Sequence, residues 1–124
     1  FGNIVAGSSS GTVKIETDNA RSHSGDVTLP ALSAGTITSA QFTVSGLPNA
    51  SYSIAVPASI IITREGGTEI MIVDDITTTP AMSGTLSENG EQIIKVGATL
   101  HVDANQEEGV YTNESGMTVT VAYQ

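Results

Sequence analysis

Two histidines, His23 and His101, are the only side chains of this sequence that could serve as an imidazole base. His23 lies between two serines in the stretch RSHSG. However, neighbouring side chains in a loop point apart, whereas a nucleophile and its base normally meet through the fold. His101 lies between Leu100 and Val102, so in a strand it would face away from the apolar side. We therefore expect no catalytic residues and no enzymatic activity.

Acidic side chains gather at two places and could offer oxygen ligands to a metal. Asp74 and Asp75 are adjacent, and Asp103, Glu107 and Glu108 cluster around a turn. Calcium requires several oxygens that converge on one point, and this spacing matches no calcium-loop pattern. Cysteine is absent, which excludes disulfides and cysteine-ligated metals. We expect solvated turns, no metal site and no cofactor, with calcium at one of the turns as the alternative.

Length and charge limit the possible classes of protein. A chain of 124 residues is one domain by the usual prior, so we expect a single domain over residues 1–124. Thirteen acidic residues against four Lys and Arg give a net charge of −9, which argues against nucleic acid and anionic membranes as partners. No apolar run approaches the roughly 18–20 residues of a membrane-spanning helix. The first residue is Phe1 rather than Met, so we expect either a removed leader or a start inside a longer precursor.

The segments that must position these side chains alternate apolar and polar residues, as strands do. Alternating segments separated by turn residues predict seven to nine short strands, including a hairpin around the Gly-Gly turn of IIITREGGTEIMIV. We expect FGNIV as a short strand before the turn AGSSSG, DNARSHSGD as a loop, Pro30 at the end or edge of a strand, and ITTTPAMSGTLSENGE as an irregular connection. The apolar sides of the alternating runs give the predicted core, which consists of Val13, Ile15, Phe42, Val44, Ile54, Val56, Ile94, Val96, Leu100, Val102 and Val119.

A series of short strands is typical of a β-sandwich or a barrel, and the stretch LHVDANQEEGVY favours an immunoglobulin-like sandwich. It contains a strand, a corner, and then Gly109 and Tyr111 at the start of the next strand. In immunoglobulin-like folds a tyrosine at this place bonds through its hydroxyl to the backbone of the corner. The alternative is that Tyr111 is an ordinary, half-buried aromatic residue of a strand.

The closing segment GVYTNESGMTVTVAYQ raises a pairing problem. Its last residues alternate, with Met117, Val119, Val121 and Tyr123 on the apolar face. It could be one strand interrupted at NESG or a hairpin with NESG as the turn, and we favour the interrupted strand because GVYT is a very short first leg. The sandwich then lacks its final strand, and its core is open along a groove beside the four apolar residues.

The sequence resembles, nearly end to end, a group of secreted bacterial domains of unknown function that are distantly like the spore-coat-U-type subunits of archaic chaperone–usher pili. The matching stretches are FGNIVAGSSSGTVKI, GDVTL, AQFTVSGLPNASYSIAVP, VGATLHVDANQEEGVYT and VTVAYQ. The resemblance implies a secreted, often pilin-like β-sandwich and implies no activity. A weaker likeness is to classical pilins, which end in an alternating strand with a tyrosine next to last, as Tyr123 is here, and a glycine about a dozen residues earlier, for which Gly109 and Gly116 are candidates.

In those pilins a periplasmic chaperone first docks on the last strand, and the N-terminal extension of a neighbour then replaces it. Relatives usually carry an alternating apolar segment before Phe1-Gly2, and this sequence does not include one. We still expect the donor to be a neighbour's N-terminal segment around or before Phe1, so Phe1 and Ile4 join the four C-terminal residues as the predicted interface. The rival donor is the strand FGNIV of the same chain.

Two classes of function therefore remain. The first is a structural subunit of an extracellular filament that polymerises with itself, assisted by a chaperone and an outer-membrane usher, through strand addition. The second is a self-contained secreted binding module, adhesin-like, that recognises carbohydrate or protein through loops such as DNARSHSGD. Exposed aromatic side chains usually form the platforms that bind sugars, and aromatic residues are scarce here, which favours the filament subunit.

Overall fold

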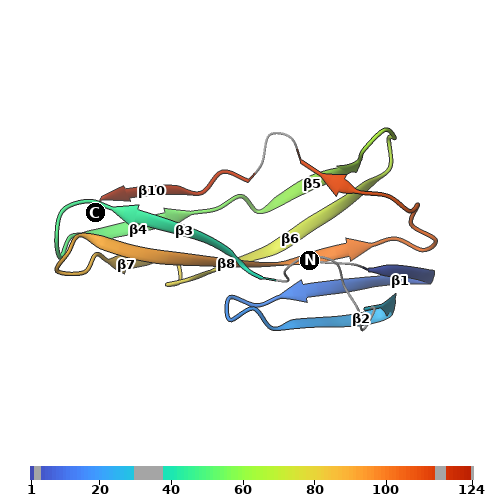
Figure 1. Ribbon diagram of the computed structural model, residues 1–124, viewed down its shortest axis with the longest axis horizontal. Helices are drawn as coiled ribbons and strands as arrows, with labels where there is room; N and C mark the ends of the chain where they lie inside the picture. The colour runs from blue at the N-terminus through green and yellow to red at the C-terminus, as the bar shows by residue number, and fades with distance from the viewer. Residues whose placement is uncertain (2–3, 30–37, 114–116, 124) are drawn as a thin grey trace.

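The computed structural model describes residues 1, 4–29, 38–113 and 117–123, which form ten β-strands and no helix (Figure 1). The strands are β1 (Val5–Ile15), β2 (Arg21–Thr28), β3 (Ala40–Ser45), β4 (Ser51–Ala55), β5 (Ser59–Arg64), β6 (Ile70–Thr79), β7 (Ser83–Thr85), β8 (Glu91–Val102), β9 (Tyr111–Thr112) and β10 (Thr120–Tyr123). Within these residues there is accordingly no helix of the length and apolar character needed to cross a membrane.

The strands form two antiparallel sheets. The large sheet has the order β2-β1-β8-β6-β5-β9, and β3 also pairs with β8. Because β1 pairs with the second half of β8 and β3 with the first half, these two strands follow one another along the same side of β8. The small sheet has the order β10-β4-β7. The predicted all-β sandwich is therefore confirmed.

The core is divided into two clusters. One cluster is shared by both sheets and contains Tyr52, Ile54, Leu86, Ile94 and Val96. The other lies inside the curved large sheet alone and contains Val13, Val27, Val73, Leu100 and Val102. No described sheet faces the second cluster, which is instead covered by partly buried side chains that include Phe1, Ile4 and Leu29.

Most of the predicted core residues are buried. Val13, Ile15, Ile54, Ile94, Val96, Leu100 and Val102 are at most 4% exposed. Val44, Val56 and Val119 are only partly buried, against the cluster that the two sheets share. Alternation along a strand therefore identified the inward faces correctly.

Phe42 corrects one prediction, because 37% of it is exposed. It lies opposite the fully buried Ile94 in the β3–β8 register, so the two side chains share the inward face of the sheet. However, β3 pairs only with β8 among the described strands and so lies at an edge. The face of Phe42 was predicted correctly, but no described strand lies beyond it to complete its burial.

Three of the predicted loops are strands instead. β1 continues through AGSSSG with a bulge between Ala6 and Gly11, where the Asp26 carboxylate accepts bonds from Ser8 Oγ (3.2 Å) and Ser9 N (3.1 Å). Most of DNARSHSGD forms β2, because it pairs with β1. The segment ITTTPAMSGTLSENGE contributes the end of β6 and all of β7. The prediction for Pro30 lies outside the described residues.

The closing segment is one interrupted strand. β9 pairs with β5, and β10 pairs with β4, the strand that precedes β5. Thr112 lies opposite Thr63 and Thr120 opposite Ala55, so both chains advance eight residues between these pairs. The register is unchanged across the interruption, as expected for one strand and not for a hairpin.

Candidate functional site, an open apolar groove

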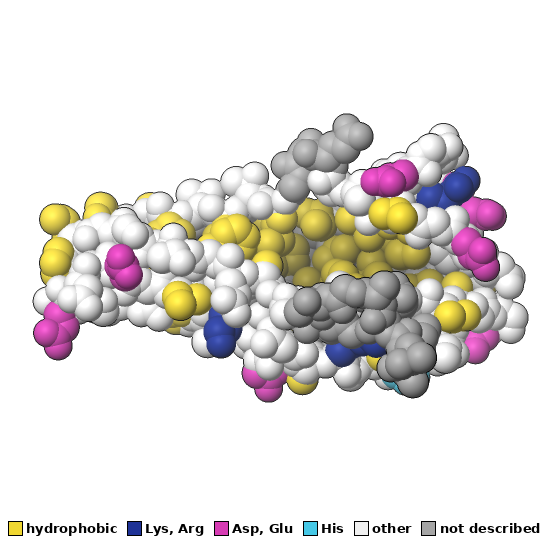
Figure 2. Space-filling model, viewed as in Figure 1, with side chains coloured by type: hydrophobic (Ala, Val, Ile, Leu, Met, Phe, Trp, Pro, Cys, Tyr) yellow, Lys and Arg dark blue, Asp and Glu magenta, His cyan; other side chains and the backbone are white. Residues whose placement is uncertain are grey.

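An apolar groove runs along the curved large sheet, and its floor is the uncovered side of the core. Figure 2 shows hydrophobic side chains gathered in a hollow over the region where β6 and β8 lie in Figure 1. The β1–β3 side forms one wall, and the segment that leads into and through β9 forms the other. The floor comes from β5, β6 and β8, and its residues are Ile60, Ile62, Met71, Val73, Val96, Ala98, Leu100 and Val102.

The groove contains two pockets. The larger, of about 830 Å³, lies between the start of β1 and the corner before β9, where Glu107 and Glu108 form part of its rim. The smaller, of about 370 Å³, is lined mostly by apolar side chains and extends from Ile15 to Met117. Of the described residues, three line both pockets, namely Phe1, Ile62 and Tyr111, so they mark the place where the pockets meet.

The strand β10 presents main-chain groups at one edge of the small sheet. Ile54 N donates to Met82 O (2.7 Å), so the main chain of Ile54 faces away from β10. Since successive residues of a strand bond to opposite sides, Ser53 and Ala55 face β10 and bond their partners there. Val121, which lies opposite Ile54, therefore directs its N–H and C=O toward the edge that no described strand pairs.

The predicted apolar face of the closing strand does point into the molecule. Met117, Val119 and Val121 are partly buried against the cluster that the two sheets share. Tyr123 is different, because 59% of it is exposed. Its hydroxyl accepts a bond from the Leu47 N–H (3.0 Å) at the end of β3, and a Cβ on Gly46 would collide with that hydroxyl. Tyr123 thus links β10 to the β3–β4 turn.

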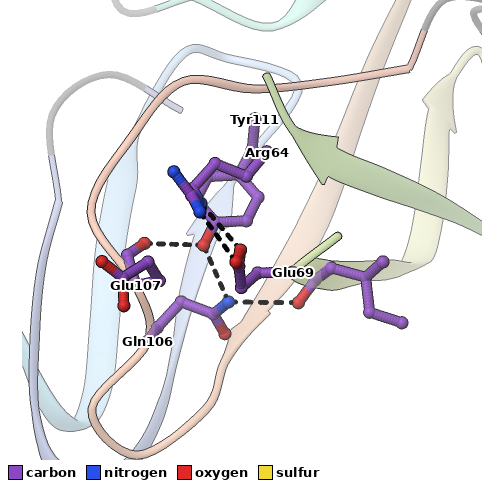
Figure 3. Close-up of polar contacts among 6 residues, drawn as sticks. Arg64, Glu69, Gln106, Glu107 and Tyr111 are labelled. Atoms are coloured by element: carbon purple, nitrogen blue, oxygen red, sulfur yellow. Dashed lines mark hydrogen bonds and ion pairs between the residues drawn. The ribbon is translucent and has the colours of Figure 1, made fainter. Parts of the chain in front are cut away.

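Tyr111 bonds back to the corner that precedes it (Figure 3). Its hydroxyl donates to Glu107 O (2.6 Å) and accepts from Gln106 Nε2 (2.9 Å). Gln106 Nε2 also donates to Ile70 O (3.2 Å), which joins the corner to β6. This is the geometry that the sequence led us to expect of a tyrosine corner, and it makes one wall of the larger pocket rigid.

An ion pair supports the same wall. Arg64 Nε and Nη2 donate to the two carboxylate oxygens of Glu69, each at 2.8 Å, across the β5–β6 hairpin (Figure 3). These hydrogen bonds from Arg64 lower the pKa of Glu69 from 4.5 to about 2. Gly109 has a φ of 148°, and a Cβ there would meet the Arg64 side chain at 2.7 Å, so glycine lets the corner pass close to this pair. Gly116 lies outside the described residues.

The N-terminal residues lie on the other side of the groove. Phe1 and Ile4 pack against the core cluster of the large sheet. Val5 begins β1 and lies opposite Thr28 of β2, so the described residues of FGNIV, namely Phe1, Ile4 and Val5, do not pair with β10. Arg21 Nη1 donates to the Phe1 carbonyl oxygen (2.7 Å). The groove therefore contains Phe1 and Ile4 at one wall and Met117 at the other, whereas Val121 and Tyr123 continue the second wall toward the Leu47 turn.

The histidines and acidic residues lie apart from the groove floor. His101 Nε2 is 2.7 Å from Asp74 Oδ1 on the outer face of the large sheet, where both side chains are about two-fifths exposed. His23 is exposed on β2. Among the described residues, no three His, Asp or Glu side chains lie close enough together to hold a metal ion.

Sequence reasoning missed the floor of the groove. Ile60, Ile62 and Met71 did not appear in the predicted core, although the runs SIIIT and EIMIVDD are rich in apolar residues. Both faces of these runs carry isoleucine or valine, so the period alone did not say which face would be inward. The register with β8 decides it, because Val73 lies opposite Leu100.

Comparison with known proteins gives a family but no characterised relative. A family model described as "Domain of unknown function (DUF4402)" matches residues 1–123. No curated protein matches the chain, and no solved structure matches it either.

Proposed function

The chain belongs to the DUF4402 family, whose function is unknown, and we propose that it is a structural subunit of an extracellular filament that assembles by β-strand addition between copies. The observation that carries this proposal is the position of the β10 edge. The main-chain N–H and C=O of Val121 point toward that edge. The apolar groove lies beside β9, the strand that β10 continues. An unpaired edge next to uncovered apolar side chains is a template for an added strand.

The size of the groove suits a strand. The floor residues on β8 run from Val96 to Val102, about 20 Å at 3.3 Å per residue. Every second side chain of an added strand would face the floor of the groove. Four or five apolar side chains, each worth roughly 1.5–3 kcal/mol on burial, would make a very stable joint.

The donor in this proposal is the segment that leads into β1 of a second copy. From Val5 onward the chain is already paired within its own large sheet. Phe1 and Ile4 lie outside these ladders, and they belong, with any residues ahead of them, to the proposed donor segment. Donating this segment to a neighbour would therefore break none of the hydrogen-bond ladders that β1 forms in its own molecule.

The pilin-like resemblance extends the proposal to location and partners. The subunit is secreted, it polymerises with itself, and a periplasmic chaperone and an outer-membrane usher would protect the groove before assembly. It needs no cofactor and performs no reaction. The alternative of a self-contained binding module loses its proposed recognition loop, because most of DNARSHSGD forms strand β2.

Electron microscopy of the native protein tests the proposal directly. Filaments of a uniform width would support the subunit, whereas dispersed particles at high concentration would favour the binding module. The sharpest variant is Ala98→Leu, which adds bulk within the smaller pocket without removing any contact. We expect it to keep the thermal midpoint of the wild type and to lose filament formation.

Val121→Asp is the complementary variant, since a carboxylate beside the groove should repel an apolar donor strand. Ile93→Asp is its matched control, because Ile93 is 52% exposed on the outer face of β8. We expect the control to form filaments and Val121→Asp to form none. Normal filaments from both Val121→Asp and Ala98→Leu would refute strand addition at this groove.

A further inference from the structure

Phe1 lies in the groove of its own chain. It lines both pockets, and it shares this position only with Ile62 on the floor and Tyr111 on the opposite wall. Figure 1 shows the N-terminus near the middle of the molecule, in front of the region where β6, β8 and β1 come together. Phe1 therefore lies in the groove at the place where the two pockets meet.

Two kinds of contact hold Phe1 in place. Its ring is half-buried and packs against the core cluster of the large sheet. Its carbonyl oxygen accepts a 2.7 Å hydrogen bond from Arg21 Nη1, at the start of β2. Among the described residues that line the two pockets, Phe1 is the one to which Arg21 donates this bond.

We infer that Phe1 closes the middle of its own groove and must leave it before a strand from a second copy can enter, an inference that rests on the proposed function. A strand added beside the β9–β10 line would lie about 4.8 Å from it. The ring of Phe1 lies across this path, opposite Tyr111, and two groups cannot occupy one space. The N-terminal segment thus has two positions, folded back on its own groove or donated to a neighbour.

This arrangement gives the free subunit a partial cover. Exposed apolar pockets beside an unpaired edge promote aggregation, and the Phe1 ring covers part of the apolar pockets. Among the described residues, the ring packs against the core and the Phe1 carbonyl oxygen accepts the Arg21 bond. The rate of assembly then depends on how often Phe1 leaves the groove.

Arg21→Gln tests this dependence without changing a side chain of the donor or of the groove lining. We expect it to shorten the half-time of assembly about two- to tenfold, the range expected for losing one net hydrogen bond. The matched control is Lys95→Gln, which makes the same change of charge on the outer face of β8 and should assemble at the wild-type rate. Light scattering gives both half-times.

A second measurement examines the free subunit alone. The chain has no tryptophan, so Phe1→Trp introduces a single one, and Ile93→Trp supplies an exposed reference. We expect the tryptophan at position 1 to emit at shorter wavelength than the reference and to resist quenching by acrylamide. Adding Arg21→Gln to Phe1→Trp should raise its quenching.

The outcomes separate this inference from the proposed function. Equal quenching of the two tryptophans would overturn the inference, whether or not filaments form. Protection of the tryptophan at position 1 with equal assembly rates for Arg21→Gln and Lys95→Gln would also overturn it, because Phe1 would not limit entry. If neither the wild type nor any variant assembles, the proposed function has failed. The acrylamide quenching of the tryptophan at position 1 then still decides whether Phe1 closes the groove.

Discussion

Tyr111 stabilises the wall of the groove through its hydroxyl, which bonds to both Glu107 O and Gln106 Nε2. Tyr111→Phe should therefore lower the free energy of unfolding by about 1 kcal/mol, the usual net value of a hydrogen bond. Urea denaturation measures this change. Tyr123→Phe is the comparison, and it should have a smaller effect because its one partner, the Leu47 N–H, is exposed at a turn. Equal effects would mean that the corner bond has no special role.

Glu69 makes stability depend on pH in the acid range. Its pKa is about 2 in the folded chain, below the ordinary value of 4.5, because Arg64 donates two bonds to its carboxylate. A lowered pKa means that the ionised group stabilises the fold above about pH 4.5, and that this contribution disappears as the pH falls from 4.5 toward 2.

We therefore expect Glu69→Gln to lower the thermal midpoint at neutral pH and to match the wild type near pH 2. Differential scanning calorimetry across this pH range gives the comparison. Glu88→Gln, at an exposed turn position, serves as the control for the loss of one negative charge. A constant difference between wild type and Glu69→Gln at every pH would contradict the assignment of this ion pair.

At the scale of elements, edge strands decide how much an inward side chain is buried. Phe42 and Ile94 lie opposite each other, yet one is 37% exposed and the other is fully buried. Ile94→Ala should cost roughly 2–5 kcal/mol of stability, and Phe42→Ala roughly 1–2 kcal/mol, because water already reaches the Phe42 ring. Urea denaturation of the free subunit tests the order. A larger loss for Phe42→Ala would mean that another segment covers β3 in solution.

At the scale of the whole molecule, charge opposes contact between copies. Each chain carries a net charge of −9, so two copies repel at low ionic strength. Salt screens this repulsion, with a Debye length that falls from about 30 Å at 0.01 M to about 8 Å at 0.15 M. We expect assembly to accelerate over this range of sodium chloride, as followed by light scattering. Slower assembly in salt would instead indicate that opposite charges attract across the joint.

The sequence by itself determined the inward faces of the strands that are apolar on one side, and it favoured one interrupted strand over a hairpin for the closing segment. Val13, Ile54 and Leu100 are buried as their alternation predicted. Which residues of a strand share a face is a local property, because successive side chains point to opposite sides whichever strand lies beside it.

The tertiary structure alone decided which strands are neighbours. RSHSGD has no alternation, and it forms β2 only because β1 lies beside it. The groove exists because the inward faces of β5, β6 and β8 have no opposing sheet, and Phe1 lies in it because Arg21 is close by. Such contacts join residues far apart in the chain. The alternation of apolar and polar residues along a strand shows which face is inward, but it does not show which element covers that face.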